Sequence, residues 1–360
     1  MVSEIYRVFS TFKEYRTGKV AKGQPRHPLL GLLMILFLAR VAGCRGWDAS
    51  ADWAKAHFEL LGRYLPLWKR PPSADTLRRT AEAYALPAVL DAIATTEDGT
   101  VHIDGKRLRG ATHDGQVHHV VEALCGGRVI GLVEMGAGAE GPAMVALLQN
   151  LALADKLVTI DAGGTTPAVA ATIRQRGGDY LLAVKGNQPA LWTALDHAFA
   201  QHTGPAHTTK EWGHGRHDIR RAQTITPPAI VTAVAATAAI PDIACLCRIE
   251  RTRITPDGIA TTVHYHVSSR RLTPRRYARI RRAHWRIEAM HHVLDGALNE
   301  DASQIRNAAA AWATLCRVAY AVLAEVRGKL SFRRGAEFLR ANPRPLLEAC
   351  MRPQTGQELS

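Results

Sequence analysis

The sequence has few cysteines, and none has the spacing of a structural metal site. Six cysteines occur among 360 residues without any C-x-x-C pair, and Cys245 and Cys247 share an alternating, strand-like stretch. Structural zinc sites use closely spaced cysteine and histidine pairs, and disulfide frameworks need a higher cysteine density. The pattern argues against both and favours a reducing cytosol, so we expect a cytoplasmic protein.

The sequence also lacks an apolar run long enough to cross a bilayer. The most apolar stretch, LLGLLMILFLA at 29–39, is ended by Arg40, well short of the roughly 20 residues that a membrane helix needs. Too many charges precede it for a signal peptide. We expect a buried helix there and no membrane partner.

Acidic residues are scarce relative to basic ones. Lysine and arginine number 46 against 32 aspartate and glutamate, which gives a net charge of +14, while 47% hydrophobic residues leave material for a sizeable core. Such an excess indicates an acidic partner, nucleic acid before a membrane surface. At roughly 150 residues per domain, the length suggests two or three domains.

The expected secondary structure changes near Gly99. Before it the pattern is helical, with Ser73 as an expected N-cap. After it come three short strands, a helix, a strand, a helix and a strand (β-β-β-α-β-α-β), then an antiparallel insertion with a turn at 256–258. Helices are expected at 274–297 and 303–326. The expected parts are a helical domain (1–95), the first part of an α/β core (96–191), a β-rich insertion (192–271), the last core helices (272–330) and a basic C-terminal tail (331–360).

The segment VHIDGKRLRG at 101–110 admits two interpretations. Asp104-Gly105 followed by three cations is typical of a strand that ends in an exposed turn. Alternatively, Asp104 binds a metal ion and the cations behind it line a groove for a polyanion. These ten residues alone do not decide between them.

A second aspartate, Asp161, ends the expected strand KLVTIDA and also has two interpretations. The sequence GAGAEG at 136–141 matches G-x-G-x-x-G, with Asp161 twenty residues beyond the last glycine, as in a dinucleotide-binding oxidoreductase that uses Gly136, Gly138 and Gly141. Against this, the preceding strand closes an antiparallel meander, and Pro142 delays the helix. A nicotinamide site also has no need of a net charge of +14.

The other interpretation pairs Asp104 with Asp161. The element order matches the ribonuclease-H-like fold, an α/β fold with a mixed sheet, in which the first and fourth strands are neighbours and these aspartates converge. Two neighbouring carboxylates repel each other unless a cation lies between them, and Mg²⁺ prefers oxygen ligands.

A third carboxylate is expected on the helix from Pro274. Its apolar positions recur every three or four residues, and Glu288 lies on the opposite, polar side, where a solvated face with i,i+4 pairs is the alternative. Asp295 and Glu300-Asp301 are the fallback carboxylates. The preceding RRLTPRRYARIRR (270–282) carries seven arginines in thirteen residues, which favours phosphate contact. Trp285 is expected in the core.

Together these segments resemble the DDE transposases of bacterial insertion sequences, in the ISAs-type group that includes the H-repeat-associated proteins. The likeness covers roughly residues 25–325. The matching pieces are IDGKRLRG (103–110), TIDA (159–162), GGDYLLAVKGNQ (177–188), HGRHDIR (214–220), YHVSS (265–269), HWRIE (284–288), HHVLD (291–295) and NED (299–301).

The resemblance implies a transposase that cleaves DNA and transfers strands at the ends of an insertion sequence. It implies that residues 1–95 bind the DNA ends and that residues 96–191 and 272–330 form the catalytic core. Its catalytic, metal-binding residues fall on Asp104, Asp161 and Glu288. We expect two Mg²⁺ ions, with Mn²⁺ as a substitute, bridged by Asp104 and about 3.5–4 Å apart. The partners are double-stranded DNA and, since two DNA ends must be paired, a second copy in a homodimer. The expected DNA contacts are Lys106, Arg107, Arg109, Lys185, Arg216, Arg275, Arg276, Arg279, Arg281 and Arg282.

The chain departs from the family pattern beside these carboxylates. Thr166 stands where the family usually has Gln, Ala289 where it has Asn and His292 where it has Trp; His284 and Asp295 replace the Arg and Lys of a related signature. A catalytically impaired or domesticated DNA-binding relative is therefore the alternative to an active transposase.

Overall fold

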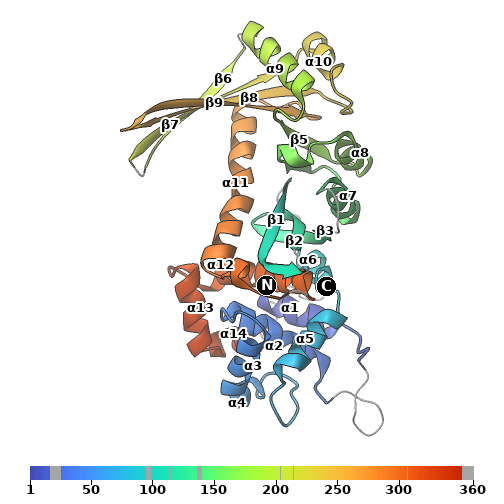
Figure 1. Ribbon diagram of the computed structural model, residues 1–360, viewed down its shortest axis with the longest axis vertical. Coiled ribbons are helices and arrows are strands. Elements are labelled where there is room, and N and C mark those ends of the chain that lie inside the picture. Colours follow the sequence, from blue (N-terminus) through green and yellow to red (C-terminus); the bar gives the residue numbers. More distant parts are fainter. Residues whose placement is uncertain are drawn as a thin grey trace, which may run out of the picture.

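A mixed sheet of nine strands runs through the described residues, in the order β3-β2-β1-β4-β5-β9-β8-β7-β6. The computed structural model describes residues 1–16, 26–94, 99–113, 116–135, 140–202, 204–213, 215–305 and 307–350. An all-helical part lies at one end of the molecule and the last four strands lie at the other, with helix α11 running between them (Figure 1).

The first five strands form one side of this sheet, with β3 at its edge. They are β1 (Thr100–His113), β2 (Gln116–Cys125), β3 (Arg128–Met135), β4 (Leu157–Ile160) and β5 (Asp179–Val184). The strands β1, β2 and β3 form an antiparallel meander. The strand β4 lies parallel to β1 on one side and to β5 on the other. The expected adjacency of the first and fourth strands is confirmed.

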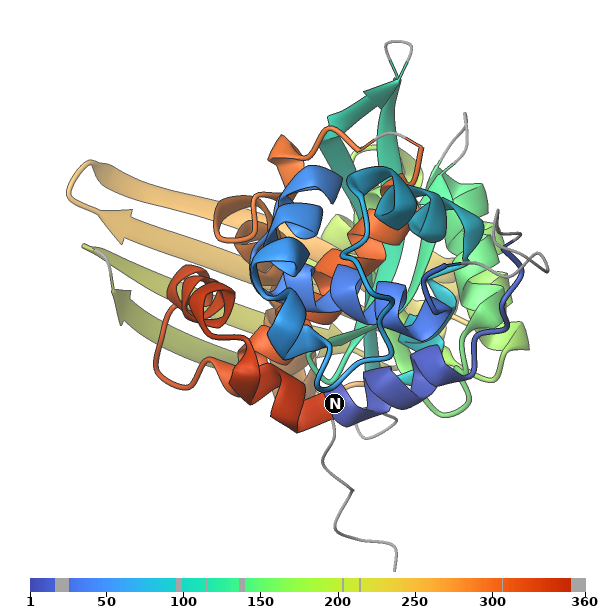
Figure 2. The ribbon, with the colours of Figure 1, turned by 90° about the horizontal axis from the view of Figure 1, so that it is seen from below.

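The remaining strands continue the same sheet. They are β6 (Ala206–Gly213), β7 (Arg216–Ile225), β8 (Cys245–Thr255) and β9 (Gly258–Ser268), paired antiparallel in series, with β9 joined to β5. We call β6–β9 the ribbon. Its far end curves away from the rest of the molecule (Figures 1 and 2). The turn between β8 and β9 falls at Pro256-Asp257, as the sequence predicts, because Gly258 accepts a φ of 145°.

Helices cover both faces of the sheet. The face that carries Val101 and Ile103 shares a core with α7 (Glu140–Asn150), α8 (Pro167–Gln175), α9 (Pro189–Gln201) and α10 (Pro228–Ala235). The opposite face receives α11 (Pro274–Gly296), whose first half packs on β5 and β8 through Tyr277 and Ile280. A short 3-10 helix, η1 (Ala162–Gly164), follows β4.

The helical part draws on both ends of the chain. Its helices are α1 (Val2–Ser10), α2 (Leu29–Val41), α3 (Trp47–Ala56), α4 (Phe58–Leu61), α5 (Ala74–Ala83), α6 (Ala88–Ala92), α12 (Ala309–Val326), α13 (Phe332–Ala341) and α14 (Arg344–Cys350). Helix α2 is buried along almost its whole length, as predicted, and the expected N-cap is present, since Ser73 accepts the backbone N–H of Thr76. Helix α12 alone among the described helices has the length and apolarity to cross a membrane, and 72% of that window is buried in the fold.

The structure differs from the expected C-terminal tail. Residues 332–350 form the helices α13 and α14, and the buried side chains Leu339, Leu346 and Leu347 join the core of α1, α2 and α12. Each of these short helices has only a narrow apolar stripe among its basic residues, so the helical pattern is hard to recognise in the sequence. The tail is therefore part of the helical body.

Helix α2 provides a test of how closely the helical part is packed. An alanine at Gly31 would place its Cβ on the carbonyl oxygen of Pro66 and 2.8 Å from Leu67 Cδ2. The gain in helix propensity is about 1 kcal/mol, whereas overpacking costs about 1–3 kcal/mol. We expect Gly31→Ala to lower the free energy of unfolding in urea. Gly296→Ala, in a helix with nothing within 4 Å of the new Cβ, should instead raise it slightly; the same sign for both would contradict the packing described here.

Candidate active site

Asp104 and Asp161 lie side by side where β1 and β4 part. The parallel pairing ends at Ile103 and Ile160, and the next residue on each strand is the aspartate. The interpretation of Asp104-Gly105 as an exposed turn is wrong, because β1 continues to His113 and keeps pairing with β2, with Asp104 opposite Glu122. Asp104 therefore lies just beyond the parallel pairing of β1 with β4 and within the antiparallel pairing of β1 with β2.

The two carboxyl groups have opposite electrostatic environments. Burial, together with the nearby charges of Glu122 and Asp161, raises the pKa of Asp104 to about 6, against the opposing effects of His291 and the N–H of Gly105. Burial alone would also raise the pKa of Asp161. There the N–H of Ala162 and the ammonium of Lys185, whose Nζ lies 3.1 Å from Asp161 Oδ2, prevail and lower it. A lysine ammonium accompanies Asp161, whereas at Asp104 burial and the neighbouring carboxylates outweigh the opposing effects of His291 and Gly105.

Polar contacts fix α11 to the sheet on both sides of these aspartates. Toward its start, His284 Nδ1 lies 2.8 Å from Thr159 Oγ1, which in turn bonds His102. Burial lowers the pKa of His284 to about 3, so this imidazole is neutral. Further along, His291 bonds Glu122 and lies 3.7 Å from Asp104 Oδ2. The polar stripe of the helix thus faces the sheet.

Glu288 lies between these two anchors. It follows His284 by four residues and precedes His291 by three, so all three side chains share one face of the helix. Unlike its neighbours, Glu288 is exposed. In the described parts of the chain no three histidine, cysteine, aspartate or glutamate side chains converge as closely as a metal site requires. Glu288 therefore shares a helix face with two histidines that contact the sheet, and its own side chain is exposed to solvent.

A buried ion network adjoins Asp104, and sequence reasoning missed most of it. Glu122 and Arg317 are both fully buried, with Arg317 Nε 2.5 Å from Glu122 Oε2, and Arg317 also bonds Glu300 on the 3-10 helix η2 (Glu300–Ala302). Lys106 Nζ lies 2.6 Å from Asp295 Oδ1. All three fallback carboxylates, Asp295, Glu300 and Asp301, are thus engaged in ion pairs. The signal available in the sequence was the lone arginine inside the apolar helix ATLCRVAYAVL.

The structure distributes the expected DNA contacts over three places. Lys106 is a correction: only 6% of its side chain is exposed and it is paired with Asp295, so it does not line a DNA groove. Arg107 and Arg109 are exposed beside it on β1, while Lys185 and Arg281 lie near Asp161. Arg216 lies on the ribbon, with Nε 3.5 Å from Asp218.

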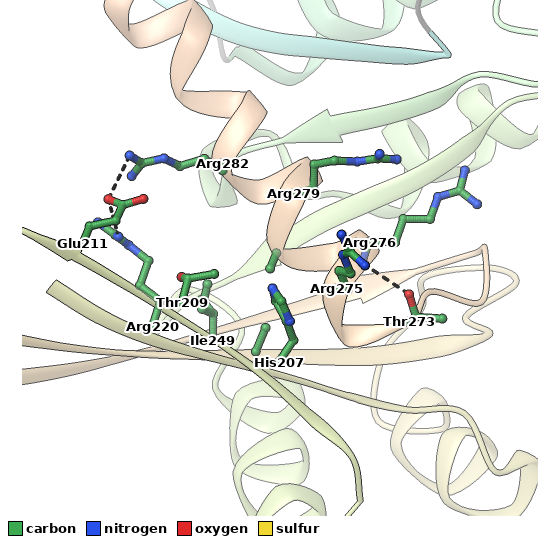
Figure 3. Close-up of a pocket in the computed structure, with 12 residues that line it drawn as sticks. His207, Thr209, Glu211, Arg220, Ile249, Thr273, Arg275, Arg276, Arg279 and Arg282 are labelled. Atoms are coloured by element: carbon green, nitrogen blue, oxygen red, sulfur yellow. Dashed lines mark hydrogen bonds and ion pairs between the residues drawn. The ribbon is translucent and has the colours of Figure 1, made fainter.

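The other four arginines line a groove between α11 and the ribbon. Its volume is about 420 Å³, and Figure 3 shows it with Arg275, Arg276, Arg279 and Arg282 on the helix side. The ribbon contributes His207, Glu211 and Arg220. We call this the ribbon groove. Trp285, expected in the core, is instead 37% exposed beside it.

Most of the glycine-rich segment lies outside the described residues. Positions 136–139 are not described, and α7 begins at Glu140, ahead of Pro142. Gly136 and Gly138 of the dinucleotide alternative therefore have no structural account, and only Gly141 lies within α7.

Comparison with known proteins identifies the family. The family described as Transposase DDE domain matches residues 93–323, and a family described as DDE_Tnp_1-associated matches residues 7–90. The chain belongs to the DDE transposase family, and it is an enzyme that acts on DNA. The dinucleotide alternative has no support.

The relatives are bacterial. YncI of Escherichia coli O157:H7, whose name describes it as a transposase, is 30% identical over 312 residues, covering 81% of this chain and 80% of the relative. The H repeat-associated protein YhhI of Escherichia coli K12 is 29% identical, covering 84% and 85%. A piggyBac transposase synaptic complex with hairpin DNA matches with a TM-score of 0.44 at 11% identity over 99% of this chain and 80% of that one, a likeness on which nothing below rests. The predicted resemblance to insertion-sequence transposases is confirmed.

Proposed function

We propose that this DDE transposase cuts DNA and joins strands at the ends of an insertion sequence, using Asp104, Asp161 and Glu288. The observation that carries the proposal is the placement of both aspartates at one point of the sheet. Glu288 supports it by its position on α11 between His284 and His291, the histidines that contact the sheet beside Asp161 and Asp104. The strand order β3-β2-β1-β4-β5 supports a ribonuclease-H-like core.

The donor set fits a hard divalent cation. Carboxylate oxygens are the ligands that Mg²⁺ and Mn²⁺ prefer, and the raised pKa of Asp104 marks a site where added positive charge is stabilising. Asp104, Asp161 and Glu288 would together hold two such ions. When bound, the ions would activate water and stabilise the leaving 3′ oxygen of the DNA. The chain itself holds Asp161 through Ala162 and Lys185, and Asp104 through Gly105.

The surroundings of these carboxylates suit a DNA backbone. Arg107 and Arg109 are exposed on β1, and Arg281 and Lys185 flank Asp161. Cations at these positions would contact phosphates, which fix the register of DNA without reading its sequence. Because both ends of an element must be held together, the working form is proposed to be a homodimer on DNA, acting in the cytoplasm.

The test is nicking of a supercoiled plasmid that carries the gene's own flanking DNA, in Mg²⁺ or Mn²⁺. Glu288→Gln should lower the nicking rate by at least about 100-fold, since it removes a ligand charge. Glu337→Gln, on α13, is the matched control and should leave the rate unchanged. Nicking that survives Glu288→Gln but is lost in Asp301→Asn would move the third carboxylate to Asp301. Wild-type protein that binds DNA tightly without nicking would identify a catalytically impaired relative instead.

Metal binding should weaken in acid. A carboxyl group with a pKa raised to about 6 carries a proton below that pH, and a metal ion binds only the ionised form. The apparent Kd for Mn²⁺, measured by calorimetry without DNA, should rise about tenfold for each pH unit below about 6. It should be nearly constant above about pH 7. An unchanged Kd between about pH 5 and 7 would show that Asp104 is not a ligand.

A further inference from the structure

The ribbon groove is strongly cationic, and one carboxylate stands within it. Among the described lining residues, five are arginines and Glu211 is the single acidic side chain. Its Oε2 atom lies 2.9 Å from Arg282 Nη2 on α11 and 2.9 Å from Arg220 Nη1 on β7 (Figure 3). Glu211 therefore ties the ribbon to the helix by occupying two guanidinium groups at once.

Both arginines are held in place apart from Glu211. Their guanidinium carbons lie 5.4 and 5.7 Å from the ring centre of Trp285, for Arg282 and Arg220 respectively. Arg220 also donates to Asp218, at 3.3 Å. Two guanidinium groups fixed around one oxygen make a site for any oxyanion, and a DNA phosphate fits it as well as a carboxylate does.

An incoming anion can displace Glu211 from its ion pairs with the two arginines. The Glu211 side chain is 43% exposed and that of Arg282 is 50% exposed, whereas that of Arg220 is 11% exposed. Ion pairs this accessible to solvent contribute little to stability. A DNA strand that brings several phosphates to the groove at once also meets Arg275, Arg276 and Arg279.

The position of the groove fixes its distance from the carboxylates. Arg275 to Arg282 precede Glu288 by six to thirteen residues of one continuous helix, which at about 1.5 Å per residue is roughly 9–20 Å. Phosphates of one strand advance about 3.4 Å along duplex DNA. The groove therefore lies about three to six nucleotides from the bond to be cut.

We propose that the ribbon groove binds the backbone of one DNA strand about three to six nucleotides from the cut, and that Glu211 holds the phosphate position of Arg220 and Arg282 when DNA is absent. The proposal rests on the proposed function for the identity of the polyanion. It assigns Glu211 the role of a competitor that DNA must displace, so that removing its charge strengthens DNA binding.

The experiment measures the Kd for a fluorescein-labelled duplex of the gene's flanking DNA, in EDTA so that no cleavage occurs. Glu211→Gln should lower the Kd about two- to fivefold at low salt, which is the range of an exposed ion pair. Glu337→Gln removes the same charge from α13, at the other end of the molecule (Figure 1), and should have a smaller effect. In an Arg282→Gln background, Glu211→Gln should lower the Kd for DNA by no more than the control substitution does.

Two results would overturn the proposal. One is a change in Kd for Glu211→Gln equal to that for Glu337→Gln, which would show that only the net charge of the protein matters. The other is a gain that persists unchanged in the Arg282→Gln background. Neither depends on cleavage, so a wild-type protein that fails to nick would count against the proposed function and leave this comparison intact. Methylphosphonate at single phosphates, numbered from the mapped nick, should weaken wild-type binding most at about three to six nucleotides.

Discussion

Asp104→Asn should abolish metal-dependent nicking while making the protein more stable at pH 8. The side chain keeps its shape, so the backbone pairing of β1 with β2 is preserved, but one ligand charge of the proposed metal site is lost. A loss of at least about 1,000-fold in nicking rate is expected, in line with the several kcal/mol that bound metal ions contribute to phosphoryl transfer.

The gain in stability follows from the raised pKa. Burial and the neighbouring carboxylates lift the pKa of Asp104 from 3.8 to about 6, so the folded state holds its proton more tightly than the unfolded state does. Wild-type stability therefore falls as pH rises from about 4 through 6, by up to about 3 kcal/mol. An asparagine side chain at this position carries no charge and escapes this penalty. The variant should exceed wild type by about 1–3 kcal/mol at pH 8 and match it near pH 4.

Urea unfolding at about pH 4.5 and about pH 8, without metal, measures the difference. Asp257→Asn, in the exposed turn of the ribbon, is the charge-matched control and should change neither nicking nor stability appreciably. Nicking within about tenfold of wild type would remove Asp104 from the proposed ligands. Loss of nicking together with lower stability at pH 8 would point to a damaged fold and not to a missing ligand.

The sequence predicted the parts of the site that local patterns determine. Apolar periodicity placed the end of α11 within one residue of its observed end at Gly296, and the order of strands brought Asp104 beside Asp161. Both features follow from the spacing of residues close to one another in the chain. The family's catalytic positions fall on Asp104 and Asp161, which the fold brings together, and on Glu288, whose role stays a prediction.

What failed depends on contacts between distant segments. The pair Asp104-Gly105 is typical of a turn, but no turn forms there, because β1 pairs with β2 along ten register positions. Lys106 looked like a DNA contact because its partner Asp295 lies 189 residues away. The alternative of a fully solvated polar stripe on α11 is wrong, because His284 and His291 of that stripe contact Thr159 and Glu122 on the sheet. A charge pattern shows that a face is polar, and only the fold shows what that face meets.

Arg317→Met is the substitution expected to destabilise the fold most. It removes the cation of a fully buried network and leaves Glu122 and Glu300 without their main partner. Arg317 and His291 hold the pKa of Glu122 well below its usual range against the effect of burial, so this carboxylate is charged in the folded protein. An uncompensated buried charge costs about 3–5 kcal/mol.

Removing the whole network should cost less than removing the arginine. In the triple variant Glu122→Gln, Arg317→Met, Glu300→Gln no buried charge of this network remains unpaired, and such replacements are often close to neutral. The free energy of unfolding in urea should therefore recover by about 2 kcal/mol or more relative to Arg317→Met. Arg333→Met, which replaces an exposed arginine that donates to the Gly296 carbonyl, is the control and should cost less than about 1 kcal/mol.

The network also bears on the active site, because Glu122 stands directly opposite Asp104 on the neighbouring strand. In Arg317→Met the charge of Glu122 would repel Asp104 without compensation, so the pH below which Mn²⁺ binding weakens should move upward from about 6. In the triple variant the same pH should move downward, since one of the carboxylates that raise the pKa of Asp104 has become neutral. Both variants lack Arg317, so a general loosening of the fold would shift the pH of Mn²⁺ release in the same direction in each. Shifts in opposite directions would show an electrostatic effect of Glu122.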